Sequence, residues 1–365
     1  MVKEKSVAIW EAFCDQLKQA GGVLARNTTP DDELTQAEGL RKLVRLIRVG
    51  FEASFEYADT SMPTVYRLVT PTTIGEGETS DAHYFQSMID GVRTFRLKGR
   101  RGDAPFIEFT TYNGKVGLHA KSEQIASLTE QDLLVDDTGN YEIILSPNRY
   151  SGNWLRTTAE TSVLYIREYT HDWSKTRETT FEISRLDGAD VQPAAMTVAS
   201  VEQAMRRTAG YVSRSIQTWA AIVDFRRGQE PNKFFPFEQE SDPDESPEMP
   251  TGHRFSSGYF RLQEHEALLI RLVPQQVPYW GLDTTNYWFE PLSYGDSRSH
   301  VNNGTAVVGK DGVITMVIAT KNPGVPNWID TRGHCEGVML FRWSRTSLPL
   351  PELQTQVVAV DAVRR

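Results

Sequence analysis

The sequence predicts a mainly β protein, built from two repeated antiparallel β-sandwich-like units with N-terminal helices and one connecting helix. Short runs rich in β-branched and aromatic residues, separated by Gly and Asn, fill residues 81–169 and 258–343, as is typical of sheet. A set of motifs also recurs about 174 residues further along the chain, which indicates an internal duplication. Three segments with helical periodicity lie outside these runs.

A first helix is predicted over residues 7–20, before Gly21 and Gly22. We expect it to dock by one face, which carries its regularly spaced apolar residues Trp10, Phe13, Cys14 and Leu17.

A second helix begins near a capping-box pattern formed by Thr35 and Glu38. One side carries apolar residues, namely Leu40, Leu43, Val44, Ile47 and Phe51. The other side carries basic residues, namely Arg41, Lys42, Arg45 and Arg48. This pattern favours a buried apolar stripe under a solvated basic face. A basic amphipathic helix could also lie on an anionic membrane or meet an acidic partner.

A third helix is predicted from Ser200 to about Arg227, and the acidic, Pro-containing segment 238–248 after it is expected to be an exposed loop. The chain then divides into four parts. These are a helical segment 1–80, a first β repeat 81–192, a connecting helix and acidic loop 193–257, and a second β repeat 258–365.

The duplication rests on motifs that agree in order and spacing. Asn153-Trp154 and Asn327-Trp328 lie 174 residues apart, each after a strand that follows an Asp/Gly turn. Arg167 and Arg342 end the last strand of each copy beside an aromatic residue. Recurrence in both copies favours a structural role for the Asn-Trp corner and for the arginines, although Arg342 is kept as a ligand-binding candidate.

Composition excludes several classes of function. The 39 Lys and Arg against 48 Asp and Glu give a net charge of −9, which argues against a general nucleic-acid binder. Two cysteines, Cys14 and Cys335, cannot build a disulfide framework, and the seven histidines are scattered, so no metal and no cofactor are expected. No apolar run is long enough to span a membrane and the start does not read as a signal peptide, so we expect a cytoplasmic protein.

Candidate catalytic residues come from the place where the two copies differ. Asp330 and His334 replace Arg156 and Glu160, and an Asp that orients a His can form a general acid/base pair. The alternative is a loop held by Asp hydrogen bonds with a surface His. Glu290 is a candidate second carboxylate, as in a glycosidase, paired with Asp330 or Asp283.

The segment 279–290 packs five aromatic residues among polar groups. Such a pattern suits a sugar ring or another flat ligand, and a buried sandwich core explains it equally well. The ligand-binding candidates here are Trp280, Trp288, Asn286 and Asp283.

The Asp/Gly turn, the Pro326-Asn327-Trp328-Ile329 corner and the terminal strand around Arg342 resemble the bacterial family catalogued as domain of unknown function 1214. Further matching motifs are Ile89-Asp90-Gly91, Gly152-Asn153-Trp154-Leu155 and Asn286-Tyr287-Trp288. The resemblance implies a β-sandwich fold and no particular reaction, so it assigns no catalytic residue. In many members this domain follows a second uncharacterised domain, whereas helices precede it here.

The leading functional hypothesis is a small-molecule-processing enzyme, a hydrolase or lyase, that uses acid/base chemistry on a neutral carbohydrate-like or glycosidic ligand. The first alternative is an enzyme or binding protein for a hydrophobic lipid, steroid or terpenoid ligand. The second is a non-catalytic β-sandwich interaction protein. We expect a small-molecule ligand, no nucleic acid and no integral membrane segment. Association of identical copies into a homo-oligomer is left open.

Overall fold

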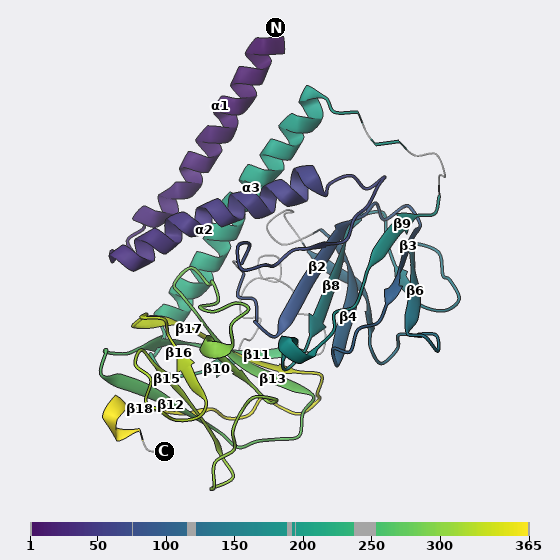
Figure 1. The fold of residues 1–365 in the computed structure, drawn as a ribbon. Coiled ribbons are helices and arrows are strands. Elements are labelled where there is room, and N and C mark those ends of the chain that lie inside the picture. The colour runs from purple at the N-terminus through teal and green to yellow at the C-terminus, as the bar shows by residue number, and fades with distance from the viewer. Residues whose placement is uncertain are drawn as a thin grey trace.

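The computed structural model describes residues 2–74, 76–114, 122–187, 192–193, 195–236 and 253–363. Two β units lie below a helical layer, and helix α1 projects from the rest of the molecule (Figure 1). The fold is mainly β, as predicted. The acidic segment 238–248, predicted to be an exposed loop, lies outside the described residues.

Within the residues described, the first repeat has nine strands in two sheets. Their bounds are β1 (Tyr66–Arg67), β2 (Ala82–Met88), β3 (Phe95–Arg100), β4 (Phe106–Asn113), β5 (Glu123–Thr129), β6 (Asn140–Ser146), β7 (Trp154–Arg156), β8 (Thr161–Tyr169) and β9 (Glu182–Arg185). The five-stranded sheet has the order β1-β2-β8-β4-β5 and the four-stranded sheet has the order β7-β6-β3-β9. Neighbours are antiparallel, except that β6 and β7 are parallel.

The second repeat has the same topology. Its strands are β10 (Phe235–Pro236), β11 (His253–Arg261), β12 (Glu266–Leu272), β13 (Tyr279–Thr285), β14 (His300–Asn302), β15 (Ile314–Ala319), β16 (Trp328–Asp330), β17 (Glu336–Ser344) and β18 (Gln354–Ala359). The sheet orders are β10-β11-β17-β13-β14 and β16-β15-β12-β18, so every strand matches the one nine places earlier. The duplication predicted from the recurring motifs is therefore present along the whole of both units.

The Asn-Trp corner has the same structural role in both repeats. The Asn153 side chain accepts from the Leu134 amide and donates to the Leu134 carbonyl, both at 2.8 Å. Asn327 makes the same pair of bonds to Val307, at 2.7 and 2.8 Å. The asparagine thus ties the preceding loop to the start of a parallel strand pair and satisfies backbone groups that a loop would otherwise leave open.

Each sandwich encloses its own apolar core, and a third core joins the two repeats to the helices. The helices are α1 (Val2–Ala20), α2 (Glu33–Phe51) and α3 (Val198–Arg227). Tyr84 and Tyr279, on the outer faces of the two five-stranded sheets, share this third core with Leu46 of α2 and Val212 of α3. The repeats face each other, and the helices pack against both.

The orientation predicted for the first two helices is wrong in part. In α1, Trp10 is 60% exposed and Cys14 is exposed, because the helix packs mainly on α3 and projects beyond the sheets. In α2, Lys42 is fully buried while Leu40 and Val44 are 59% and 66% exposed. Lys42 and Arg45 of the basic side therefore face the protein, where the buried carboxylate of Glu290 lies close to them, while Arg41 and Arg48 are half exposed.

Candidate functional site

A charged cluster lies between α2 and the second repeat, and we call it the α2 network. It contains three residues predicted from the sequence, Asn286, Glu290 and His334, together with Glu38, Arg41 and Arg45 of α2. The helix and the β unit are far apart in the chain, so the network forms only when they dock.

His334 is bonded to Glu38. Its Nε2 lies 3.0 Å from Glu38 Oε2, and its Nδ1 lies 2.8 Å from the carbonyl oxygen of Thr331. Both partners are hydrogen-bond acceptors when Glu38 is ionised, an arrangement that favours a proton on each ring nitrogen. Burial opposes this charge, but the hydrogen bond and the charge of Glu38 outweigh it and raise the pKa of His334. Burial likewise opposes ionisation of Glu38, and the bond to His334 outweighs it and lowers the pKa of Glu38.

Asn286 connects Glu38 to a second carboxylate. Its amide nitrogen donates to Glu38 Oε2 at 2.8 Å and approaches Glu290 Oε2 at 3.4 Å. Its side-chain oxygen accepts from the backbone amides of Trp288 and Glu290, both at 3.0 Å, and closes a tight turn. Within the turn Phe289 has a φ of 61°, a conformation that costs free energy for an aromatic residue and that surrounding contacts must enforce.

Cations of α2 surround Glu290. Arg45 donates to its Oε1 at 2.8 Å and Arg41 donates to its Oε2 at 3.1 Å. Arg41 also donates to Glu38 at 3.0 Å, and its side chain is half exposed, so the network reaches the surface at this arginine. Lys42 lies fully buried nearby, and its burial lowers the pKa of its ammonium despite the negative charge of Glu290.

Asp330 does not pair with His334. Its Oδ1 accepts from the backbone amide of Arg332 at 2.8 Å, within a turn where Arg332 and Gly333 both have positive φ. The predicted acid/base pair is therefore replaced by His334 and Glu38, and Asp330 has the turn-forming role that was the alternative. The pairing of Glu290 with Asp330 or Asp283 is likewise replaced by its link to Glu38 through Asn286.

The two predicted platform tryptophans are both 1% exposed. Trp280 packs in the core of the second repeat, with its ring 5.9 Å from that of Phe341. Trp288 packs beneath α2, where its indole nitrogen donates to the Thr35 carbonyl at 2.7 Å. Neither ring offers a face to a ligand in this structure.

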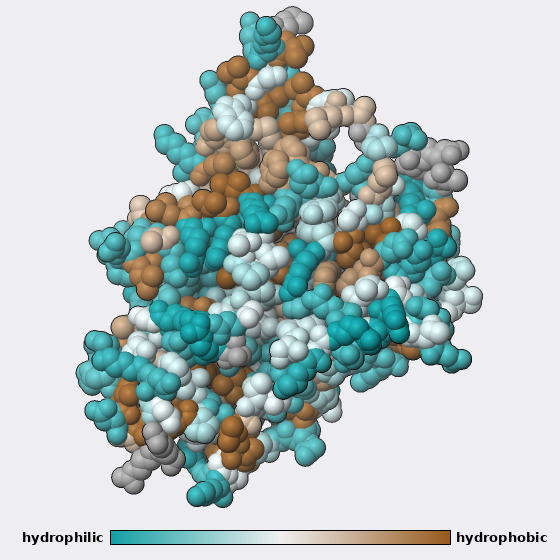
Figure 2. All heavy atoms as spheres, in the orientation of Figure 1, coloured by the Kyte–Doolittle hydropathy of each residue, from teal (hydrophilic) through white to brown (hydrophobic). Residues whose placement is uncertain are grey.

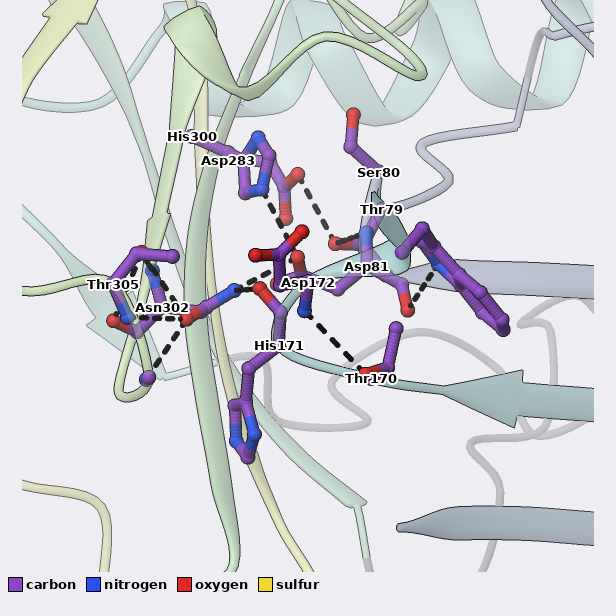
Figure 3. A network of polar contacts seen from close by, with 12 residues as sticks. Thr79, Ser80, Asp81, Thr170, His171, Asp172, Asp283, His300, Asn302 and Thr305 are labelled. Atoms are coloured by element: carbon purple, nitrogen blue, oxygen red, sulfur yellow. Dashed lines mark hydrogen bonds and ion pairs between the residues drawn. The ribbon is translucent and has the colours of Figure 1, made fainter. Parts of the chain in front are cut away.

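A second polar cluster lies where the repeats meet, and we call it the junction network (Figure 3). Asp81, just before β2 of the first repeat, accepts from three side chains of the second. Tyr279 donates at 2.9 Å, His300 at 3.0 Å and Asn302 at 2.8 Å. Burial opposes the charge on His300, but the bond to Asp81 and its negative charge together raise the pKa of His300 to about 9.

Two further predicted residues, Asp283 and Arg342, pair with each other in the junction network. Thr79 of the first repeat donates to Asp283 at 3.1 Å, and Arg342 also donates to the Gly77 carbonyl. Burial raises the pKa of Asp283, and the charge of Arg342 opposes that shift. Both side chains belong to the second repeat and are almost fully buried, and their bonds to Thr79 and Gly77 form the contact with the first repeat.

Glu108, Arg167 and His253 form a related buried set, of which sequence reasoning singled out Arg167 and missed Glu108 and His253. Arg167 and His253 each approach Glu108 Oε2 at 3.6 Å, and Ser127 donates to its Oε1 at 2.9 Å. Burial disfavours the charge on Glu108, but His253 and Arg167 outweigh it and hold the pKa of Glu108 at about 2. The recurring arginines thus both neutralise a buried carboxylate, the structural role that was favoured for them.

A shallow groove of about 850 Å³ lies elsewhere, on the four-stranded sheet of the first repeat. It is lined by residues of β3, β6, β9 and the loop before β6, Lys98, Arg100, Asp136 and Tyr141 among them. Within the described ranges, no group of three or more His, Cys, Asp or Glu side chains is placed to hold a metal ion. No helix there is long and apolar enough to cross a membrane.

The fold and these clusters define a class of protein: a two-repeat β protein with a helical cover and buried charged contacts between its parts. Residues 80–172 match the family described as Protein of unknown function (DUF1214). A crystal structure of an uncharacterised protein from Burkholderia cenocepacia is similar over 97% of this chain and 98% of that one, with a TM-score of 0.90 and 30% identity. The chain belongs to the DUF1214 family.

The VPA0106 protein from Vibrio parahaemolyticus has a related fold, with a TM-score of 0.50 and 9% identity over 87% of this chain and 96% of that one. No curated protein has a detectably similar sequence. The comparisons therefore establish family and fold.

Sequence reasoning missed Glu38 as a site residue because it sits in a helix 296 positions before His334. The sequence pattern indicated Glu38 only as a capping residue, whereas α2 begins earlier and has Asp32 as its cap. The signal that could have identified Glu38 as a site residue is its position on the same helical side as Lys42 and Arg45.

Proposed function

We propose that this protein is a small-molecule-processing enzyme that uses acid/base chemistry in the α2 network. The observation that carries the proposal is the 3.0 Å hydrogen bond between His334 and Glu38, with a second carboxylate, Glu290, linked to Glu38 through the amide of Asn286. A proton donor next to an ionised carboxylate is what general acid/base catalysis requires. The strained turn that holds Glu290 supports the proposal, because such backbone strain clusters at functional sites.

In this proposal His334 donates a proton to the leaving oxygen of the substrate. Glu290, held by two arginines, acts as the base. It takes a proton from a solvent water, whose oxygen bonds to the carbon of the breaking bond as the protonated leaving group departs. Asn286 and Arg41 position the two carboxylates. Glu290 is only 1% exposed, so a substrate reaches it only when the half-exposed Arg41 moves aside. A glycosidic ligand is the first substrate class to test, because paired carboxylates serve glycoside hydrolysis. The proposal includes no aromatic platform, since Trp280 and Trp288 are packed.

The test starts from nitrophenyl glycosides with the full chain, followed by the variants His334→Gln, Glu38→Gln and Glu290→Gln. Because removing a general acid or base costs about 10²–10⁴ in rate, each variant should lose at least about 100-fold in turnover. His265→Gln is the matched control, since His265 is exposed in the loop between β11 and β12. Circular dichroism melting checks that the variants fold. Turnover that survives in His334→Gln would refute the assignment, and a wild-type protein inactive on every glycoside would remove the substrate class.

The non-catalytic interaction protein is the second candidate. The observation in its favour is an apolar row on the outer side of α2, where Leu40 and Val44 are more than half exposed. Contiguous exposed apolar surface is a feature of protein interaction sites. A chain that binds no small molecule in native mass spectrometry yet associates through this row would favour it.

A further inference from the structure

The outer face of the five-stranded sheet in the first repeat carries a group of polar side chains. Strands β2, β8 and β4 are neighbours in this sheet (Figure 1). Tyr165 of β8 pairs with Gln86 on one side and with Thr110 on the other, and Arg167 of β8 pairs with Glu108. Residues that pair across antiparallel strands share a face. We call the polar residues of this face the sheet-face cluster: Gln86, Thr110, Glu108 and Arg167.

Every member of the sheet-face cluster has a buried polar atom without a hydrogen-bond partner in the described part of the chain. These atoms are Gln86 Oε1, Thr110 Oγ1, Glu108 Oε2 and Arg167 Nη1. Gln86 and Thr110 are 0% exposed and Glu108 is 1% exposed. Arg167 Nη1 lies 3.6 Å from Glu108 Oε2, which is close enough for an ion pair and too long for a hydrogen bond. Native proteins leave few buried polar atoms unpaired, so four on one face require an explanation.

The equivalent arginine of the second repeat is held by a carboxylate of its own sheet. Arg342 donates to Asp283 of β13. Asp283 pairs with Leu340 of β17, just as Thr110 pairs with Tyr165 in the first repeat. The first repeat therefore has a threonine at the position where the second repeat has the carboxylate that binds its arginine.

Tyrosine rings flank the sheet-face cluster, and part of it is open to solvent. The Arg167 guanidinium lies over the Tyr165 ring, 4.5 Å from the ring centroid. The rings of Tyr84 and Tyr112 lie 6.3 and 6.4 Å from that of Tyr165. Tyr165 is half-buried, and 14% of the Arg167 side chain is exposed. Aromatic side chains around a few placed polar groups are typical of small-molecule sites.

The charges of the cluster favour a neutral ligand. Despite its burial Glu108 is ionised, because its contacts with His253 and Arg167 hold its pKa at about 2, so it would repel an anion. Arg167 would repel a cation. The unpaired atoms include acceptors as well as a donor, and a hydroxyl group can both donate and accept. On the side drawn in Figure 2 the hydrophobic surface gathers over the helical layer, whereas the β units are mainly hydrophilic, as suits the approach of a polar molecule.

We propose that the sheet-face cluster binds a small neutral molecule with several hydroxyl groups, such as a polyol or a monosaccharide. Tyr165 stands between Gln86 and Thr110, so its half-buried ring turns aside to admit the molecule. Hydroxyl groups of the ligand then accept from Arg167 and donate to Gln86 and Glu108. Thr110 either donates or accepts, and the tyrosine rings pack against the carbon skeleton. This site shares no residue with the α2 network and does not rest on the function proposed above.

Isothermal titration calorimetry of the full chain with myo-inositol, mannitol and glucose tests the proposal. At least one of them should bind the wild type. Thr110→Val should bind it about 10-fold or more weakly, since this variant keeps the shape of the side chain and loses the hydroxyl. Ser257→Ala is the matched control, because Ser257 pairs with Leu340 as Gln86 pairs with Tyr165, and its hydroxyl is also buried and unpaired within the described ranges. It should leave the affinity unchanged.

A second variant and the melting temperatures guard against misfolding. Since the Thr110 hydroxyl is unpaired, Thr110→Val should melt at or above the wild-type temperature. Gln86→Leu removes an acceptor from the other side of Tyr165 and should also weaken binding by about 10-fold or more. A wild type that binds none of the three molecules would overturn the proposal, and so would wild-type affinity in both variants. Crystals soaked with the molecule that binds, but holding ordered water only at this face, would overturn it as well.

Discussion

The imidazolium of His300 lies between the repeats, with Asp81 of the first repeat accepting its Nε2 proton at 3.0 Å. Its pKa is raised from an ordinary value of 6.5 to about 9. A group whose pKa is higher in the folded state binds its proton more tightly there, so it stabilises the fold fully below the unfolded pKa. This contribution is lost as the pH rises through the folded pKa. The relevant window is therefore about pH 6.5 to 9.

We predict that His300→Gln removes this pH dependence. A shift of this size corresponds to about 3 kcal/mol in the free energy of unfolding, and His300 is almost fully buried, so solvent screens it little. Urea unfolding at pH 6 and pH 9 should show the wild type losing more stability than the variant, by about that amount. Equal losses in the two proteins would mean that the pair with Asp81 does not form.

At the scale of an element, the close packing of α2 on Trp288 depends on Gly39. A Cβ at this position would lie 2.5 Å from both Leu24 Cδ2 and Trp288 Cζ2. The helix can therefore approach the turn 286–290 closely enough for Glu38 to reach His334 only because position 39 has no side chain. In most helices glycine lowers the free energy of unfolding by about 1 kcal/mol relative to alanine. At position 39 the close contact makes glycine the more stabilising of the two residues.

We predict that Gly39→Ala lowers the free energy of unfolding by about 1–3 kcal/mol, since an overpacked contact must shift the helix or the indole. Gly210→Ala in α3 is the matched control. Its Cβ meets only the end of the flexible Arg214 side chain, at 2.9 Å, so the helix should be unchanged or stabilised by up to about 1 kcal/mol. Chemical denaturation of both variants measures the difference. Equal behaviour would show that α2 does not rest on Trp288.

The same helix shows what the sequence could predict and what it could not. Its periodicity predicted an amphipathic helix over the right residues, and the amphipathic pattern is real. The direction it faces was predicted wrongly in part, because burial of Lys42 depends on the charges of Glu290, Glu78 and Glu76 around it. Those carboxylates come from two other segments, and sequence spacing does not record which segments meet.

At the scale of the molecule, the internal repeat in the sequence predicted the fold better than helical periodicity predicted the orientation of α2. The two Asn-Trp corners predicted the duplication, and both make the same bonds. Strands β1 and β10 have two residues each, too short for a periodic pattern, so each unit begins earlier than the sequence indicated. Part of the candidate site was predicted from the sequence. Asn286, Glu290 and His334 do meet, but the partner of His334 is on a helix that docks from outside the repeat.

Each sandwich has a closed core of its own, which would let the repeats unfold separately if nothing else joined them. The shared core with the helices and the junction network oppose this, since both place residues of the two repeats in one buried cluster. We therefore predict a single transition for the wild type in scanning calorimetry.

Asp283→Asn should uncouple the repeats. It leaves the buried guanidinium of Arg342 without its carboxylate, a loss that costs about 3 kcal/mol or more when a buried ion pair is broken. Because the damage falls on the contact between repeats and spares both sandwich cores, the second repeat should melt at a lower temperature while the first is less affected, and the single transition should split. Asp311→Asn is the control, since Asp311 pairs with Arg271 on the surface and should leave one transition. Two transitions already in the wild type would show that the helices and the junction do not couple the repeats. A single transition in Asp283→Asn at the wild-type temperature would show that Arg342 is held by Gly77 and its aromatic neighbours alone.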